Sequence, residues 1–164
     1  MIVDDDPQIR RVLRTALVAQ GYEVVDARNG DEALEKLRDE KVDLVILDMK
    51  AFTLEQHKRV TGGVDNAQVI AFSRRLAALK RPMWFRYVLV PGLTDDPAEM
   101  KKVADFAASL GVVEHAEILP FHQMGRYKWE KLGLDYTLST TASPSQAAVA
   151  IATDIFRAAG LNAT

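Results

Sequence analysis

The feature that most constrains this chain is its regular alternation of short apolar runs with segments of helical period. The apolar runs have strand length and lie at residues 1–3, 22–27, 44–47, 83–90 and 118–119. Segments with apolar residues at helical spacing follow them, at residues 7–20, 31–38, 66–79, 94–110 and 143–160. Crossovers between parallel strands are almost always right-handed, so such units build a parallel sheet covered by helices.

This pattern predicts an α/β fold of the flavodoxin-like type, with three layers and a five-stranded parallel sheet in the order 2-1-3-4-5. A length of 164 residues fits one core, so we expect residues 1–164 to form a single domain. Two segments do not fit the alternation, and we expect residues 51–63 and 123–142 to be long connections. Connections of this length usually carry function or lack fixed structure.

Composition excludes several classes of protein. The chain has 21 Lys and Arg against 23 Asp and Glu, which argues against nucleic acid or a membrane surface as a partner. It contains no cysteine, and we therefore expect no iron–sulfur cluster, because such clusters need sulfur ligands. We find no apolar run of membrane-spanning length and no signal-peptide pattern at the start, and so we expect a cytoplasmic protein.

Three aspartates follow two of the predicted strands. Asp4 and Asp5 come directly after the first strand, and Asp48 comes after the third. The carboxyl ends of parallel strands meet at one edge of a doubly wound sheet, so we expect the three carboxylates to converge there. Oxygen ligands of this kind suit Mg²⁺. The alternative is that the aspartates are helix caps and solvated strand ends.

Three stretches of the first 50 residues form a recognisable set, namely IVDDDPQIRRVLRTAL, GYEVVDARNGDEALEKL and VDLVILDMK. Together they resemble the first half of a response-regulator receiver domain. It implies that Asp4 and Asp5 bind Mg²⁺ and that Asp48 is the phosphoacceptor. The receiver pattern then stops, because the hydroxyl residue expected after the fourth strand and the Lys-Pro expected after the fifth are absent: those strands end in Pro91-Gly92 and in Pro120-Phe121-His122.

From about residue 43 onward a second set of stretches follows, namely DLVILDMK, HKRVTGG, MWFRYVLVPGLTDD and VEHAEILPFHQMGRYKWEKLGLDY. Together they resemble the C-terminal half of a pyruvate formate-lyase activating enzyme, a radical S-adenosylmethionine protein. It implies that Asp48, Lys50 and His122 belong to a region that binds S-adenosylmethionine and a monovalent cation, with Arg86 on the adjacent strand. The cysteine triplet that holds the cluster in this family is absent.

The two resemblances overlap at DLVILD, and we infer a chimera, engineered or fused, of a receiver-like segment (1–50) and a radical-enzyme-like segment (51–164). The expected function is a fold-hybrid scaffold without complete catalytic apparatus, hence not an enzyme, that keeps an acidic Mg²⁺ pocket. One alternative is a signalling module in which Asp48 accepts phosphate from a small donor. Another is an S-adenosylmethionine-binding fragment that uses Asp48, Lys50 and His122, although Lys50 could be only a solvated cation and His122 only a loop hydrogen-bonding group.

Overall fold

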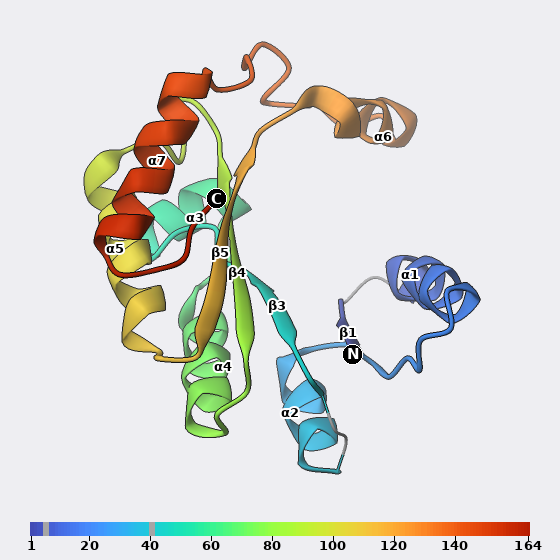
Figure 1. Ribbon diagram of the computed structural model, residues 1–164. Helices are drawn as coiled ribbons and strands as arrows, with labels where there is room; N and C mark the ends of the chain where they lie inside the picture. Colours follow the sequence, from blue (N-terminus) through green and yellow to red (C-terminus); the bar gives the residue numbers. More distant parts are fainter. Residues whose placement is uncertain (5–6, 40–41) are drawn as a thin grey trace. The chain divides into compact units, whose positions relative to one another are not determined.

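A computed structural model of the chain describes residues 1–4, 7–39 and 42–164, with only the backbone of residue 128. These residues form two compact units, Met1–Val45 with Ala67–Pro82 and Ile46–Asn66 with Met83–Thr164. Figure 1 labels most of the helices and strands of both units. That residues 1–164 behave as a single domain stays a prediction. No helix in the described part of the chain has the length and hydrophobicity that a membrane-spanning segment needs.

The first unit combines a short two-stranded sheet with three helices. Its elements are β1 (Ile2–Val3), α1 (Pro7–Ala19), β2 (Asp26–Ala27), α2 (Gly30–Asp39) and α4 (Ala67–Ala78). The two strands are parallel, with Ile2 opposite Asp26. Helix α2 begins where Asn29 accepts a hydrogen bond of 2.9 Å from the backbone of Glu32, and it buries Ala33 and Leu37. An asparagine in this position satisfies one of the free amides at a helix start.

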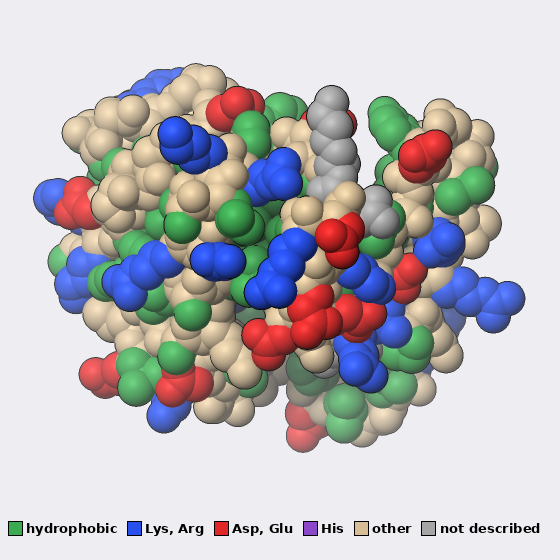
Figure 2. All heavy atoms as spheres, turned by 90° about the horizontal axis from the view of Figure 1, so that it is seen from below, with side chains coloured by type: hydrophobic (Ala, Val, Ile, Leu, Met, Phe, Trp, Pro, Cys, Tyr) green, Lys and Arg blue, Asp and Glu red, His purple; other side chains and the backbone are tan. Residues whose placement is uncertain are grey.

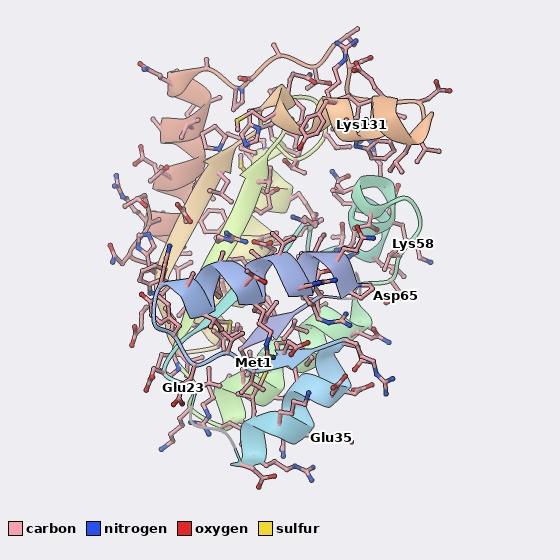
Figure 3. The ribbon with its side chains drawn as sticks, turned by 90° about the vertical axis from the view of Figure 1, so that its right-hand side faces the viewer. Met1, Glu23, Glu35, Lys58, Asp65 and Lys131 are labelled. Atoms are coloured by element: carbon pink, nitrogen blue, oxygen red, sulfur yellow. The ribbon has the colours of Figure 1, made fainter. Side chains whose placement is uncertain are left out.

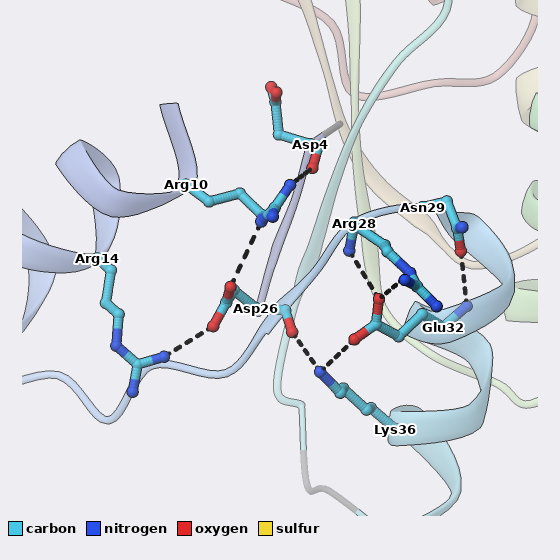
Figure 4. Close-up of polar contacts among 8 residues, drawn as sticks. All are labelled: Asp4, Arg10, Arg14, Asp26, Arg28, Asn29, Glu32 and Lys36. Carbon is cyan, nitrogen blue, oxygen red and sulfur yellow. Dashed lines mark hydrogen bonds and ion pairs between the residues drawn. The ribbon is translucent and has the colours of Figure 1, made fainter. Parts of the chain in front are cut away.

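Helix α1 is held mainly by polar contacts. None of its 13 residues, all of them described, is buried, although its sequence is strongly amphipathic. Arg14 donates a hydrogen bond of 2.7 Å to the Asp26 carboxylate, and Arg10 lies 3.4 Å from the same group (Figure 4). Arg10 also donates to the backbone oxygen of Asp4 at 2.6 Å. Side chains of both charges are interspersed on the face of the molecule that Figure 2 shows.

The second unit contains a three-stranded parallel sheet and the remaining helices. Its strands are β3 (Val45–Asp48), of which residues 46–48 belong to this unit, β4 (Met83–Leu89) and β5 (Val113–Pro120), in the order β3-β4-β5. Its helices are α3 (Leu54–Thr61), α5 (Pro97–Ser109), the 3₁₀ turn η1 (Gln123–Gly125), α6 (Arg126–Leu132) and α7 (Gln146–Ala158). Helices α5 and α7 lie together beside the sheet (Figure 1).

The core of the second unit lies on one face of its sheet. Side chains along a strand point alternately to opposite faces. In β4 the buried residues are every second one, namely Met83, Phe85, Tyr87 and Leu89. Phe156 of α7 is fully buried and packs on Tyr87, with 5.6 Å between the ring centroids. The Tyr87 hydroxyl donates to the backbone oxygen of Thr94 at 2.7 Å, and burial raises the pKa of this phenol well above its usual value.

A buried carboxylate fixes the start of α3. Glu99 of α5 is only 6% exposed, and its Oε1 accepts hydrogen bonds from the Phe52 amide (3.0 Å), the Thr53 amide (2.7 Å) and the Thr53 hydroxyl (3.0 Å). Phe52 and Thr53 directly precede Leu54, the first residue of α3, and buried backbone amides need an acceptor such as this carboxylate. Glu99 therefore joins α5 to α3 across 46 residues of sequence.

The predicted five-stranded sheet is wrong for the described residues, which form one sheet of two strands and another of three. The predicted neighbours do pair within each sheet, and both sheets are parallel where their pairing is described. The predicted order requires β1 to pair with β3, and the described sheets lack this pairing; β1 and β2 are each limited to two residues. Strands of two residues form few ladder hydrogen bonds, which is too few to extend a large sheet.

Both expected connections contain helices. Residues 51–63 include α3, and residues 123–142 include η1 and α6. Polar side chains dominate α3 and α6, so neither gives the apolar periodicity on which the prediction relied. On α6 the ammonium of Lys131, labelled in Figure 3, lies 5.4 Å from the centre of the Tyr127 ring.

Candidate functional site

The candidate site lies on the second unit's sheet, on the face opposite the buried core. Asp48 is the last residue of β3, and Arg86 is the fourth residue of β4. Both alternate with buried neighbours, Leu47 and Met49 in one case and Phe85 and Tyr87 in the other. The Met49 amide donates to the Arg86 carbonyl at 3.1 Å, and this backbone bond sets Asp48 beside Arg86.

Asp48 and Arg86 form a two-pronged ion pair. Nε of Arg86 lies 2.7 Å from Oδ1 of Asp48, and Nη2 lies 3.0 Å from Oδ2. These hydrogen bonds raise the pKa of Arg86 against the opposing effect of burial, and the charges of Asp48 and Glu117 raise it further. The side chains are 37% and 38% exposed, so the pair contributes at most about 1 kcal/mol to stability. Its main effect is to hold the Asp48 carboxylate in one orientation.

A cavity opens beyond this pair at the carboxyl ends of the strands. Its volume is about 340 Å³, and one cation, Lys50, lies among mainly apolar walls. The lining residues are Lys50, Val60, Thr61, Val88, Val90, Leu93, Thr94, Phe121 and Leu138. All of them belong to the second unit. Lys50 and Val88 each follow a member of the ion pair by two residues, which places the cavity about 7 Å further along the strands.

Polar contacts hold the walls of this cavity in place. The Gln56 amide of α3 donates to the backbone oxygen of Leu93, and Arg59 donates to Gly92 at 3.3 Å. On another side the Gln123 amide donates to the carbonyls of Leu138 and Thr141, both at 2.8 Å. The Oε1 atom of Gln123 is buried and has no hydrogen-bond partner among the described residues.

His122 follows β5 but serves as a cap. Its Nδ1 accepts from the Met124 amide at 3.4 Å at the start of η1, and its side chain is exposed. It does not line the cavity, whereas the preceding residue, Phe121, does. Its predicted role in binding S-adenosylmethionine stays a prediction.

The predicted Mg²⁺ ligands are only partly described. Asp5 lies outside the described residues, Asp4 belongs to the first unit, and Asp48 belongs to the second. Both oxygens of Asp48 accept from Arg86. Within residues 1–4, 7–39 and 42–164 no group of three or more His, Cys, Asp or Glu side chains is arranged to hold a metal ion. A magnesium site at Asp4, Asp5 and Asp48 therefore stays a prediction.

Sequence reasoning found Asp48, Lys50 and Arg86 but missed how they are arranged. The pairing of Asp48 with Arg86 joins positions 38 residues apart, and only the strand register reveals it. The apolar walls were also missed, since Val88 and Phe121 read as ordinary strand residues. For Val88 one signal was available: it alternates with Phe85, Tyr87 and Leu89, and this alternation places it on the opposite face of the strand.

Comparison with known proteins confirms both resemblances. Residues 1–51 match the family "Response regulator receiver domain". Over 107 residues the chain is 42% identical to the pyruvate formate-lyase-activating enzyme of Staphylococcus epidermidis, which is 65% of this chain and 42% of that protein. The chain thus spans about two fifths of the length of this relative. It combines a receiver-like N-terminal segment with a longer segment similar to pyruvate formate-lyase-activating enzymes.

Two solved structures share the fold. A domain of a pyruvate-formate lyase-activating enzyme from Bacteroides vulgatus aligns with a TM-score of 0.62 at 24% identity, over 82% of this chain and 71% of that one. A radical SAM methyltransferase from Sphaerobacter thermophilus aligns with a TM-score of 0.58 at 20% identity, over 80% of this chain and 36% of that one. At these identities the likeness is one of fold.

The relatives correct one expectation. We expected a protein that is not an enzyme, but the proteins similar to this chain over 107 residues are enzymes. The expectation rested on the missing cluster cysteines, in a sequence that spans less than half of those relatives. The 164 residues contain no cysteine and so do not fit a cysteine-ligated iron–sulfur cluster, whose ligands would have to come from outside this sequence.

Proposed function

We propose that the second unit binds S-adenosylmethionine in the Lys50 cavity and acts as the ligand-binding part of an activating enzyme. The observation that carries the proposal is the cavity of about 340 Å³ with one cation at its edge and the Asp48–Arg86 pair beside it. Ligand pockets of this size usually have apolar walls and a few well-placed polar groups. The 42% identity to an activating enzyme supports the family resemblance that implies this ligand class.

The charges of the site complement those of the ligand. S-adenosylmethionine carries a carboxylate, an ammonium group and a sulfonium centre, next to an adenosine with a flat adenine base. Lys50 suits the carboxylate, and Asp48 suits the ammonium group, because its oxygens have lone pairs to spare beyond the two bonds from Arg86. The apolar walls, with Val88 and Phe121, suit the adenosine. The role of the chain's own residues is thus to bind and orient the ligand.

Titration calorimetry with S-adenosylmethionine tests this proposal. We expect Lys50→Ala to weaken binding about tenfold or more, equivalent to about 1.4 kcal/mol. Lys58→Ala is the matched control, because Lys58 is an exposed lysine of α3 that does not line the cavity. Equal affinity for the wild type and Lys50→Ala, or no heat with folded protein at millimolar ligand, would exclude binding at this cavity.

The receiver match supports a second candidate, in which Asp48 accepts a phosphoryl group with Mg²⁺ held by Asp4, Asp5 and Asp48. We give it second place because Arg86 engages both carboxylate oxygens of Asp48. Intact mass after incubation with Mg²⁺ and acetyl phosphate distinguishes the two. A phosphoryl adduct that is absent from Asp48→Ala would favour the receiver chemistry, and an unmodified wild type would remove it.

We also infer that the chain is a designed or natural fusion joined near β3. The receiver match ends at residue 51, close to where the second resemblance begins, and the two resemblances overlap at DLVILD, which contains β3. A junction inside a shared strand keeps the sheet of the second unit intact, because β3 pairs with β4 through ordinary backbone bonds. The fusion therefore adds a receiver-like segment without removing a wall of the Lys50 cavity.

A further inference from the structure

A second cavity lies at the opposite end of the same strands. It has a volume of about 330 Å³ and is lined by Trp84, Glu114, His115, Glu117 and Asn162. These residues stand near the amino ends of β4 and β5 or follow α7, and all belong to the second unit. Among the described lining residues there are two carboxylates and no Lys or Arg. Neither resemblance assigns a role to this place.

An irregularity in the sheet shapes the cavity. Met83 pairs with Val113 and Trp84 pairs with His115, so Glu114 is an extra residue on β5. Such a bulge interrupts the alternation of side chains and re-aims them, and bulges are frequent next to functional sites. Here the ring centroids of His115 and Trp84 lie 5.6 Å apart at 64°, an edge-to-face contact that fixes the indole.

The end of the described chain supports the same wall. The Ala116 amide donates to the Asn162 carbonyl at 2.9 Å, and the Thr164 amide donates to the Ala116 carbonyl at 3.0 Å. The Thr164 hydroxyl lies 3.1 Å from Nε2 of His115. The side-chain amide of Asn162 donates to the backbone oxygen of Glu114 at 3.5 Å. The strand β5, which carries His115 and both glutamates, is therefore hydrogen-bonded to β4 on one side and to residues 162–164 on the other.

The chemistry of this lining selects positive charge. Trp84 leaves 42% of its surface exposed, and an indole face attracts cations. Glu117 stands opposite Arg86 in the strand register, which partly balances its charge, whereas Glu114 has no ion-pair partner among the described side chains. An anion would find no Lys or Arg in the described lining, and the cavity is larger than a bare metal ion needs.

We propose that this cavity is a binding site for a small organic cation, with a quaternary or methylated ammonium group against Trp84 and the carboxylates of Glu114 and Glu117 beside it. Aromatic rings combined with carboxylates are the usual means of recognising such groups, because the cation loses its water on the ring face and keeps a counter-charge nearby. The site is independent of the Lys50 cavity, since the two share no lining residue.

Choline and its uncharged isostere 3,3-dimethylbutan-1-ol are the probes that test the proposal. Trp84 and Trp129 are the two tryptophans of the chain, so a Trp129→Phe background makes the fluorescence report on Trp84 alone. We expect saturable binding of choline, with the isostere binding at least about tenfold more weakly. Equal binding of both probes would show an apolar site only, and no response to choline at about 10 mM with folded protein would overturn the proposal.

Four variants locate the binding. Glu114→Gln keeps the shape of the side chain and should weaken choline binding several-fold, while Glu55→Gln, an exposed glutamate of α3, should leave it unchanged. Lys50→Ala should also leave it unchanged, which separates this site from the Lys50 cavity. Trp84→Leu removes the fluorescent reporter, so calorimetry measures choline binding to this variant. Circular dichroism reports whether the variant keeps its fold. If Glu114→Gln binds choline like the wild type, the assignment of the carboxylates is wrong.

Discussion

Replacing Glu99 is expected to damage both the stability of the second unit and the Lys50 cavity. In Glu99→Ala the amides of Phe52 and Thr53 lose the acceptor that now lies 2.7 to 3.0 Å away. A hydrogen bond to a charged group contributes about 1.5–3 kcal/mol, and these bonds share one oxygen, so we expect a loss of about 3 kcal/mol. Glu99→Gln keeps a carbonyl oxygen in place and should lose about half as much.

Urea unfolding followed by tryptophan fluorescence measures this effect, because Trp84 and Trp129 both belong to the second unit. Glu55→Ala is the matched control, since it removes an exposed glutamate from the same helix start and should cost less than about 1 kcal/mol. The start of α3 should also loosen, and α3 supplies Val60 and Thr61 to the Lys50 cavity. If Glu99→Ala and Glu55→Ala unfold at the same urea concentration, the capping role of Glu99 is refuted.

Three further predictions concern packing, pH and local stability. Phe156→Ala should cost about 3–5 kcal/mol in urea unfolding, because it empties a fully buried ring position, and a loss below about 1 kcal/mol would contradict the packing on Tyr87. Burial raises the pKa of Tyr87, so the folded state favours the neutral phenol; the stabilisation is present below the unfolded pKa of about 10 and is lost as the pH rises above it. Tyr87→Phe should flatten this alkaline decline, and an unchanged decline would assign it to other groups. Amide hydrogens of α1 should exchange faster than those of α5, because α1 has no buried residue among those described, and equal protection measured by mass spectrometry would contradict this.

The sequence predicted most of the helices and strands that bury an apolar side, because burial leaves a periodic pattern of apolar residues. Helices α2, α5 and α7 lie where apolar periodicity placed them, and β3, β4 and β5 lie at or around the apolar runs. Helix α1 also lies where the periodicity placed it, but most of its apolar residues are exposed. Periodicity shows that a helix has an apolar side, but it does not show what covers that side.

The candidate site was predictable in its residues but not in its contacts. Asp48 and Lys50 follow an apolar strand, and that position at a sheet's carboxyl edge was readable from the sequence. Their partners were not, because Arg86 and the cavity walls come from strands far along the chain. For His122 the sequence indicated its place after β5 but not its contact, which is the cap that it forms at the start of η1.

Amide chemical shifts on addition of S-adenosylmethionine test the central claim most directly. A ¹⁵N-labelled sample with assigned backbone signals reports each cavity separately, through Lys50, Val88 and Phe121 in one case and Trp84 and His115 in the other. We predict that the largest changes fall on Lys50, Val88 and Phe121 and saturate with the ligand. The largest changes at Trp84 and His115, or no change in folded protein, would contradict the assignment of the Lys50 cavity as the S-adenosylmethionine site.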